Sequence, residues 1–143
     1  MLISGRCHCG NITFTLLWKP DPLEILARAC GCSFCTKHGG VWTSCSTGSL
    51  KVAVQNPALV SQYTFGTKTA AFHICSKCGI VPVATSRIED QLYAVVSVNA
   101  FEGVEPLFVR RTAATFEGES EEMRLRRRKR NWIGDVEIVE GSV

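Results

Sequence analysis

The chain has no long hydrophobic run. Nowhere in its 143 residues do about 18 uninterrupted apolar residues occur, which is the length that a membrane-spanning helix needs. The first ten residues, MLISGRCHCG, also lack the basic segment and apolar stretch of a secretory signal peptide. These absences predict a soluble, cytoplasmic protein with no membrane partner. Disulfides are rare in that reducing compartment, so we expect the eight cysteines to be thiols.

Internal repeats, low-complexity tracts and linkers are absent as well. A chain of 143 residues is long enough for one core, so we predict a single domain over residues 1–143. Helical periodicity is scarce, since only residues 22–26 and 57–62 could form a helical turn. Short segments of alternating apolar and polar residues recur instead. They predict an all-β fold, with strands at 12–16, 41–46, 50–54, 62–65, 71–74, 81–86, 92–98 and 136–139.

The excess of positive charge is confined to one place. The net charge is +3, and six of the sixteen basic residues lie between Arg124 and Arg130, in the run RLRRRKR. The acidic run EGESEEM precedes it, so we interpret the segment as a solvated turn or strand flank that is neutralised by its neighbours. The alternative is a basic arm that binds nucleic acid. We favour the first interpretation, because no aromatic residue is interleaved with the run before Trp132.

Two pairs of cysteines have the spacing of metal ligands. Cys7 and Cys9 precede a predicted strand, and in extended backbone their side chains project from the same face. Cys75 and Cys78 have the two-residue gap of a zinc knuckle, followed by Gly79, which can adopt a left-handed backbone. Neither pair completes a tetrahedron alone. Together they supply the four thiolates of a structural zinc site.

Cys30, Cys32 and Cys35 form a third group within one loop. Three protein ligands leave a tetrahedral ion one position for water or substrate, which distinguishes catalytic zinc from structural zinc. Alternatively, His38 or Cys45 could supply a fourth ligand and close the site. The cysteines could also be plain buried apolar residues, but random core cysteines rarely repeat such spacings.

Three segments carry a resemblance to a known family: GRCHCGNITF at 5–14, CGCSFCTKHGG at 30–40 and CSKCG at 75–79. They resemble the glutathione-dependent formaldehyde-activating enzymes, also called the GFA or CENP-V/GFA domain. The resemblance implies an Mss4-like, tent-shaped arrangement of antiparallel sheets. It also implies a structural zinc and a second, more weakly held zinc at the active site. The structural ligands would be Cys7, Cys9, Cys75 and Cys78, the active-site ligands would be Cys30, Cys32 and Cys35, and Cys45 would be a core residue.

The resemblance further implies a carbon–sulfur lyase whose partners are a thiol and an aldehyde. In the family reaction, the sulfur of glutathione adds to formaldehyde and gives S-hydroxymethylglutathione. Zinc favours deprotonation of a coordinated thiol, and the protein would hold thiol and aldehyde together. We predict that His38 carries a proton, because the pKa of histidine lies near neutrality, and that Gly39 and Gly40 let substrate approach the backbone.

Glutathione has two carboxylates, so a site for it should offer cations. Five basic residues outside the run are candidates, each of which is by default a solvated surface residue: Arg28, Lys37, Arg87, Arg110 and Arg111. Two functions of other classes stay open beside the enzyme. They are a non-catalytic zinc module for protein partners and, less favoured, a nucleic-acid binder that uses the basic run.

Overall fold

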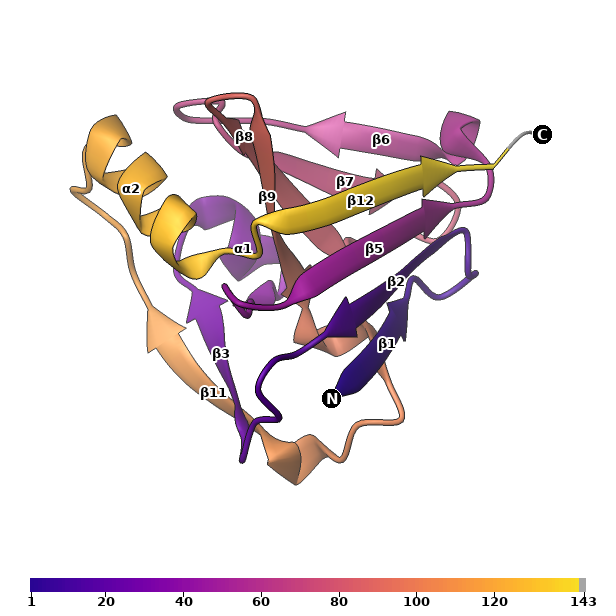
Figure 1. The fold of residues 1–143 in the computed structure, drawn as a ribbon. Helices are drawn as coiled ribbons and strands as arrows, with labels where there is room; N and C mark the ends of the chain where they lie inside the picture. The colour runs from indigo at the N-terminus through magenta and orange to yellow at the C-terminus, as the bar shows by residue number, and fades with distance from the viewer. Residues whose placement is uncertain (142–143) are drawn as a thin grey trace.

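The structure, a computed structural model, describes residues 1–141 and arranges them in two β-sheets with two α-helices beside them (Figure 1). The five-stranded sheet has the order β10, β1, β2, β5, β12, and the seven-stranded sheet has the order β11, β3, β4, β9, β8, β7, β6. The strands are β1 Leu2–Arg6, β2 Ile12–Leu17, β3 Ile25–Cys30, β4 Val41–Thr43, β5 Ser49–Val54, β6 Val60–Tyr63, β7 Ala71–Cys75, β8 Val83–Ile88, β9 Gln91–Ser97, β10 Phe101–Glu102, β11 Val109–Ala114 and β12 Asp135–Glu140. The helices are α1 Ser33–His38 and α2 Glu121–Asn131, and single 3₁₀ turns cover Pro57–Leu59, Val98–Ala100 and Pro106–Phe108.

Alternating side chains from both sheets form a shared core. In β2, Ile12, Phe14 and Leu16 are buried and Thr15 between them is exposed, as expected for a strand with one face inward. The same cluster contains Val96 of β9, the strand at the centre of the seven-stranded sheet. The two sheets are therefore held together by apolar side chains as well as by any metal that the cysteines bind.

The predicted fold class, an all-β, Mss4-like arrangement of antiparallel sheets, is confirmed, and every predicted strand overlaps an observed one. Two edge pairs differ from the prediction because they are parallel. Strand β11 pairs with β3, and β12 pairs with β5. The last two strands of the chain thus return to the edges of the two sheets.

The helical turn predicted for residues 22–26 is wrong, and so is the turn or strand flank predicted for the basic run. The neutralisation predicted for this run is observed, since Glu119 and Glu122 of the preceding acidic run pair with its arginines. Residues 25–30 form β3, in which Ile25 and Ala27 are buried in alternation. The basic run lies within α2 and is not a turn, because Arg, Lys, Glu and Leu all favour helix and Ser120 caps the first turn. Strands β1, β10 and β11 and helix α1 were not predicted either. Within residues 1–141, no helix combines the length and the apolar character that a membrane crossing requires.

Candidate metal centres and active-site cavity

The first candidate metal centre lies where turns from the two sheets meet. Cys7 and Cys9 lie in the turn after β1, Cys75 ends β7, and Cys78 lies in the next turn. The four sulfur atoms all lie within 4.8 Å of one another. Cys9 Sγ is 3.8 Å from Cys7 Sγ and 3.5 Å from Cys75 Sγ. A tetrahedron with zinc–sulfur distances of about 2.3 Å has sulfur–sulfur edges of about 3.8 Å, so this set fits a closed zinc site.

The backbone of both turns directs the cysteine sulfur atoms toward one another. Gly10 and Gly79 follow the two cysteine pairs with φ of 83° and 82°, a conformation that favours glycine. The Gly79 N–H donates to the Cys75 carbonyl oxygen at 2.7 Å, which closes the second turn. The Ile12 N–H donates to Cys7 Sγ at 3.3 Å. Cys7 and Cys75 are both 0% exposed, whereas Cys9 is exposed and Cys78 is half-buried, so a metal here would lie at the edge of the core.

The second cluster lies at the junction of β3 and α1. Cys30 ends β3, Cys32 is the N-cap of α1, and Cys35 lies inside this helix. Their sulfur atoms also lie within 4.8 Å of one another. Cys32 Sγ accepts a hydrogen bond from the Cys35 N–H at 3.3 Å, and Cys35 Sγ accepts one from Trp42 Nε1 at 3.3 Å. Helix capping and the buried indole therefore fix the positions of two of the three sulfurs.

The Cys30 and Cys35 thiols have pKa values shifted in opposite directions. A hydrogen bond from the Cys35 thiol lowers the pKa of Cys30 to about 5. That bond, together with burial, raises the pKa of Cys35. The trio therefore presents a thiolate at neutral pH, and thiolate is the form that binds metal. Sulfur ligands are typical of zinc sites, and in the described part of the chain no fourth cysteine, histidine or carboxylate joins this set.

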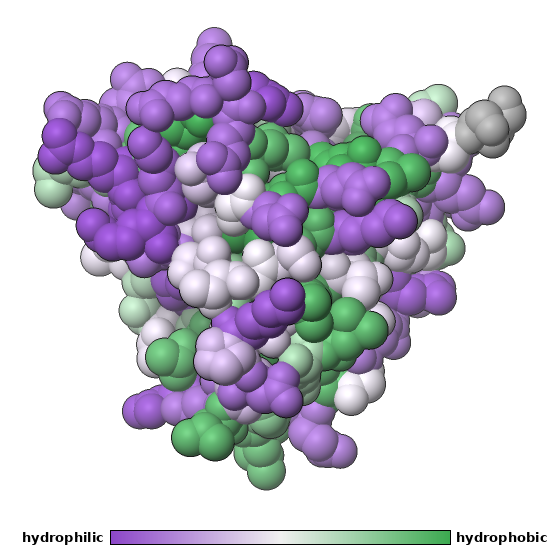
Figure 2. Space-filling view, in the orientation of Figure 1, coloured by the Kyte–Doolittle hydropathy of each residue, from purple (hydrophilic) through white to green (hydrophobic). Residues whose placement is uncertain are grey.

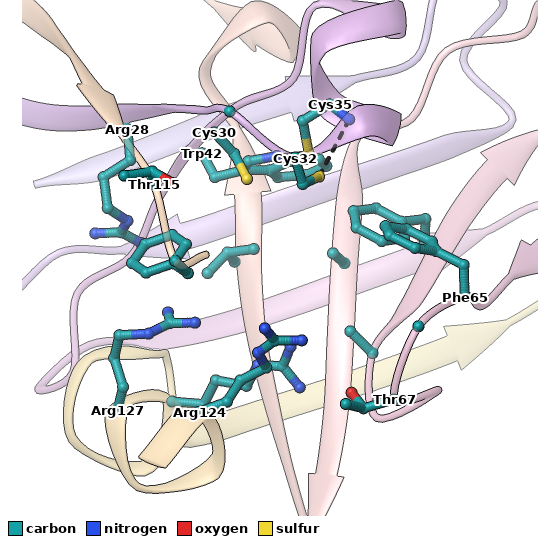
Figure 3. A pocket seen from close by; sticks show the side chains of 18 of the residues that line it. Arg28, Cys30, Cys32, Cys35, Trp42, Phe65, Thr67, Thr115, Arg124 and Arg127 are labelled. Atoms are coloured by element: carbon teal, nitrogen blue, oxygen red, sulfur yellow. Dashed lines mark hydrogen bonds between the residues drawn. The ribbon is translucent and has the colours of Figure 1, made fainter. Parts of the chain in front are cut away.

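A cavity of about 430 Å³ opens beside the trio (Figure 3). This volume is in the range of small-molecule sites, which is about 300 to 1,000 Å³. In Figure 3 the sulfur atoms of Cys30, Cys32 and Cys35 lie together at one end of the cavity. Much of the remaining wall is aromatic: Trp42, Phe65, Phe72, Phe116 and Trp132. The trio is thus open to a space that can hold a small organic molecule.

Four arginines also line this cavity. Arg28 comes from β3 and was one of the predicted cations, whereas Arg124, Arg127 and Arg128 come from α2. The sequence interpretation missed the last three because it treated the basic run as solvated. Their spacing of three and four residues was a usable signal, since such residues share one face of a helix.

The other predicted cations lie elsewhere, because none of Lys37, Arg87, Arg110 and Arg111 lines the cavity. Arg110 pairs with Glu24 at 3.5 Å, and Arg111 donates to the side-chain oxygen of Asn99 at 2.9 Å. Both are surface contacts.

His38 and Cys45 do not join the three-cysteine cluster. The His38 ring packs on Phe34, with 4.3 Å between ring centroids, and lies outside the cavity wall. Partial burial lowers the pKa of His38. Cys45 is buried, and its thiol donates to the Lys19 carbonyl oxygen at 3.4 Å. The core position expected for Cys45 is confirmed, while the proton-carrying role of His38 stays a prediction.

Gly40 packs closely against its neighbours, while the substrate access predicted for Gly39 and Gly40 stays a prediction. A Cβ at this position would lie 2.8 Å from Trp42 Nε1 and 3.1 Å from Cys35 Cβ. We therefore expect Gly40→Ala to lower the free energy of unfolding by about 1 to 3 kcal/mol, the usual effect of overpacking. Gly39→Ala is the matched control for steric crowding, because a Cβ there meets no atom within 4 Å, although its φ of 76° adds strain. Urea unfolding measures both. A more stable Gly40→Ala protein would contradict the packing role.

The fold and the two clusters define a class: a mostly-β protein whose cysteines can hold metal ions at two places. The family model described as glutathione-dependent formaldehyde-activating enzyme matches residues 2–123. The chain belongs to this family. It is also similar to a crystal structure of a Rhodobacter sphaeroides protein, with 31% identity and a TM-score of 0.58 over 76% of this chain and 99% of that chain. No curated protein matches the chain.

Proposed function

We propose that the protein is a zinc-dependent carbon–sulfur lyase of the cytoplasm that makes and cleaves the adduct of glutathione, or a related thiol, with formaldehyde or a related aldehyde. The observation that supports it best is the three-thiol cluster open to a cavity of about 430 Å³. A closed scaffold site needs no such space. The family match over residues 2–123 favours the same chemistry.

The two clusters would hold two zinc ions with different duties. Cys7, Cys9, Cys75 and Cys78 fit a structural ion, and Cys30, Cys32 and Cys35 fit a second ion with a free position. When bound, this second zinc supplies positive charge that favours the thiolate form of an incoming thiol. The chain's own contribution there is to hold the sulfurs in place through the Cys32 cap and the Trp42 hydrogen bond.

The reaction is an addition that balances without any oxidant or reductant. The thiol sulfur forms a bond to the carbonyl carbon, the carbon–oxygen π electrons move to oxygen, and the proton that leaves sulfur ends on that oxygen. Cleavage is the reverse. The cavity would contribute mainly by positioning thiol and aldehyde together, since well-oriented partners react far faster than free ones. Its aromatic wall, which includes Phe65 and Phe72, would limit the access of water.

Charge pairing argues against the nucleic-acid alternative. On α2, Arg126 pairs with Glu122 at 2.6 Å and Lys129 pairs with Glu89 at 3.1 Å. Arg124 and Arg127 both pair with Glu119. The outward-facing Arg126 and Lys129 each have their own carboxylate, and Arg124 and Arg127 line the cavity, so α2 offers few free cations for phosphates.

Metal removal tests the proposal. We expect the purified protein to hold two equivalents of zinc, because both thiol clusters fit the metal. Mild chelation should remove the second ion first and abolish adduct formation, and added zinc should restore it, since a site with three ligands and a free position releases its ion more easily than a closed four-thiolate site. Metal analysis and an assay of glutathione with formaldehyde measure the two together. Two tightly held ions without activity on any thiol and aldehyde would favour a zinc-binding interaction module instead.

A further inference from the structure

We propose that Arg28 and the inward arginines of α2 form a carboxylate-binding subsite, which restricts the thiol substrate to molecules that carry a carboxylate. The inference rests on the proposed function for the presence of a thiol at the trio, and it adds a subsite made by this chain's own C-terminal helix. The family match ends at residue 123, so Arg124, Arg127 and Arg128 all lie beyond the matched segment.

Helix α2 turns a charged face inward. Arg127 and Arg128 are half-buried and buried, whereas Arg126 and Lys129 on the other face are exposed. Figure 2 shows the hydrophilic exterior around this helix. A helix on a protein surface normally buries an apolar stripe. The inward arginines therefore indicate that this face meets something other than a plain hydrophobic core.

Within residues 1–141, the four arginines that line the cavity have fewer carboxylate partners than positive charges. Arg124 and Arg127 share one carboxylate, that of Glu119: Arg127 donates to it from Nε and Nη2 at 3.0 and 3.1 Å, and Arg124 donates from Nε at 3.3 Å. Arg28 and Arg128 have no carboxylate within 4.0 Å among the described residues, so they bond only to hydroxyl oxygens. Glu117 also lines the cavity, but it is exposed and pairs with none of the four arginines.

Arg128 is the most telling of these residues. It is 7% exposed, and its Nη1 donates to the hydroxyl oxygens of Thr69 and Ser86 at 2.8 and 3.2 Å. Its Nε is buried without any hydrogen-bond partner. A buried cation that has no counterion is costly for the free protein. An anionic ligand in the cavity would supply the missing negative charge.

The geometry favours a carboxylate that reaches across the cavity. Arg28 comes from β3 and Arg127 from α2, and Figure 3 shows both guanidinium groups turned toward the same space. The guanidinium carbon of Arg127 lies over the Phe116 ring, 3.7 Å from its centroid. Arg28 can bind a carboxylate through two parallel N–H···O bonds, whereas Arg127 already uses Nε and Nη2 on Glu119 and would offer a ligand its Nη1 group. A cation that is already held in place loses little freedom on binding. A thiol with its sulfur at the trio would place its carboxylate in this space.

Binding of an unreactive analogue tests the subsite separately from the reaction. S-methylglutathione cannot form the adduct, and its dimethyl ester lacks the two negative charges. We expect calorimetry to show that the wild-type protein binds the acid about tenfold or more tightly than the ester, because hydrogen bonds to charged groups contribute about 1.5 to 3 kcal/mol. Arg28→Gln and Arg127→Gln should each weaken binding of the acid by a similar factor and leave the affinity for the ester nearly unchanged.

Arg126→Gln is the matched control, because Arg126 lies on the outer face of α2 with its side chain 72% exposed. It should retain the preference for the acid. Arg28→Lys keeps the charge but not the two parallel hydrogen bonds, so it should recover only part of the affinity. Arg127 also pairs with Glu119, so Arg127→Gln could unfold the protein. In that case the subsite is tested by Arg28→Gln and by the comparison of acid with ester in the wild-type protein.

The outcomes separate this inference from the proposed function. Equal wild-type affinities for acid and ester, or no binding of either, would overturn the subsite whatever the enzyme's activity. The subsite would also be overturned if Arg126→Gln lost as much affinity for the acid as Arg28→Gln and Arg127→Gln do. A clear preference for the acid in a protein that forms no adduct would keep the subsite and overturn the lyase.

Discussion

Cys75→Ala is expected to abolish folded protein. Cys75 is 0% exposed, lies in the main core, and belongs to the four-thiol set that fits zinc. Structural zinc contributes about 10 to 16 kcal/mol in small zinc domains at neutral pH. Domains of this size are stable by only about 5 to 15 kcal/mol, so a site that has lost one ligand leaves little net stability. Cys7→Ala should behave in the same way.

Circular dichroism, urea unfolding and zinc analysis of the expressed protein measure this effect. Cys45→Ala is the matched control, because Cys45 is also buried but lies outside both clusters. It should remain folded and keep both zinc equivalents. A Cys75→Ala protein that is as stable as Cys45→Ala would show that the four-thiol set does not support the fold.

Cys32→Ser should have the opposite profile: a folded protein with one zinc equivalent and activity lowered more than about a hundredfold. Serine supplies a side-chain oxygen in place of the sulfur that now accepts from the Cys35 N–H, so α1 retains an N-cap. It removes a thiolate ligand, however. Substitutions that only touch the groups around a metal's ligands already lower affinity or activity by about 10- to 100-fold, so loss of a ligand should exceed this.

Cys32→Ala separates the two duties of this residue. It removes both ligand and cap, and should therefore lower the free energy of unfolding by a further about 0.5 to 2 kcal/mol relative to Cys32→Ser. Metal content, thermal unfolding and adduct formation are measured on both variants. If Cys32→Ser unfolded as completely as Cys75→Ala, the two clusters would have the same structural duty.

The cysteine spacings predict the clusters from sequence because the ligands of each half-site lie close together in the chain. Cys7 with Cys9 and Cys75 with Cys78 form local turns, so only the meeting of the two pairs needs the fold. Alternation with period two likewise predicts strands such as β2, where one face is buried. Strand β11 escapes this pattern because it is an edge strand with mostly exposed residues.

The same reasoning could not predict that arginines of α2 line the cavity. Charge runs are usually solvated. The spacing places Arg124, Arg127 and Arg128 on one face of a helix, but it does not show that this face is turned inward, with Arg128 buried and Arg126 exposed. The difference arises from how α2 packs beside β8, where Arg128 meets Ser86. It is a tertiary effect. Six-residue α1 is likewise too short to show a helical period, although its Cys32 cap fixes the trio.

The most direct test is a crystal structure of the zinc-loaded protein with anomalous scattering at the zinc edge. It shows whether one cluster binds a structural zinc and the other binds a zinc with a free position. Two zinc peaks are expected. One is bound by Cys7, Cys9, Cys75 and Cys78, and the other by Cys30, Cys32 and Cys35 with its fourth position facing the cavity. A single peak under saturating zinc, or a fourth side chain closing the three-cysteine site, would contradict this expectation.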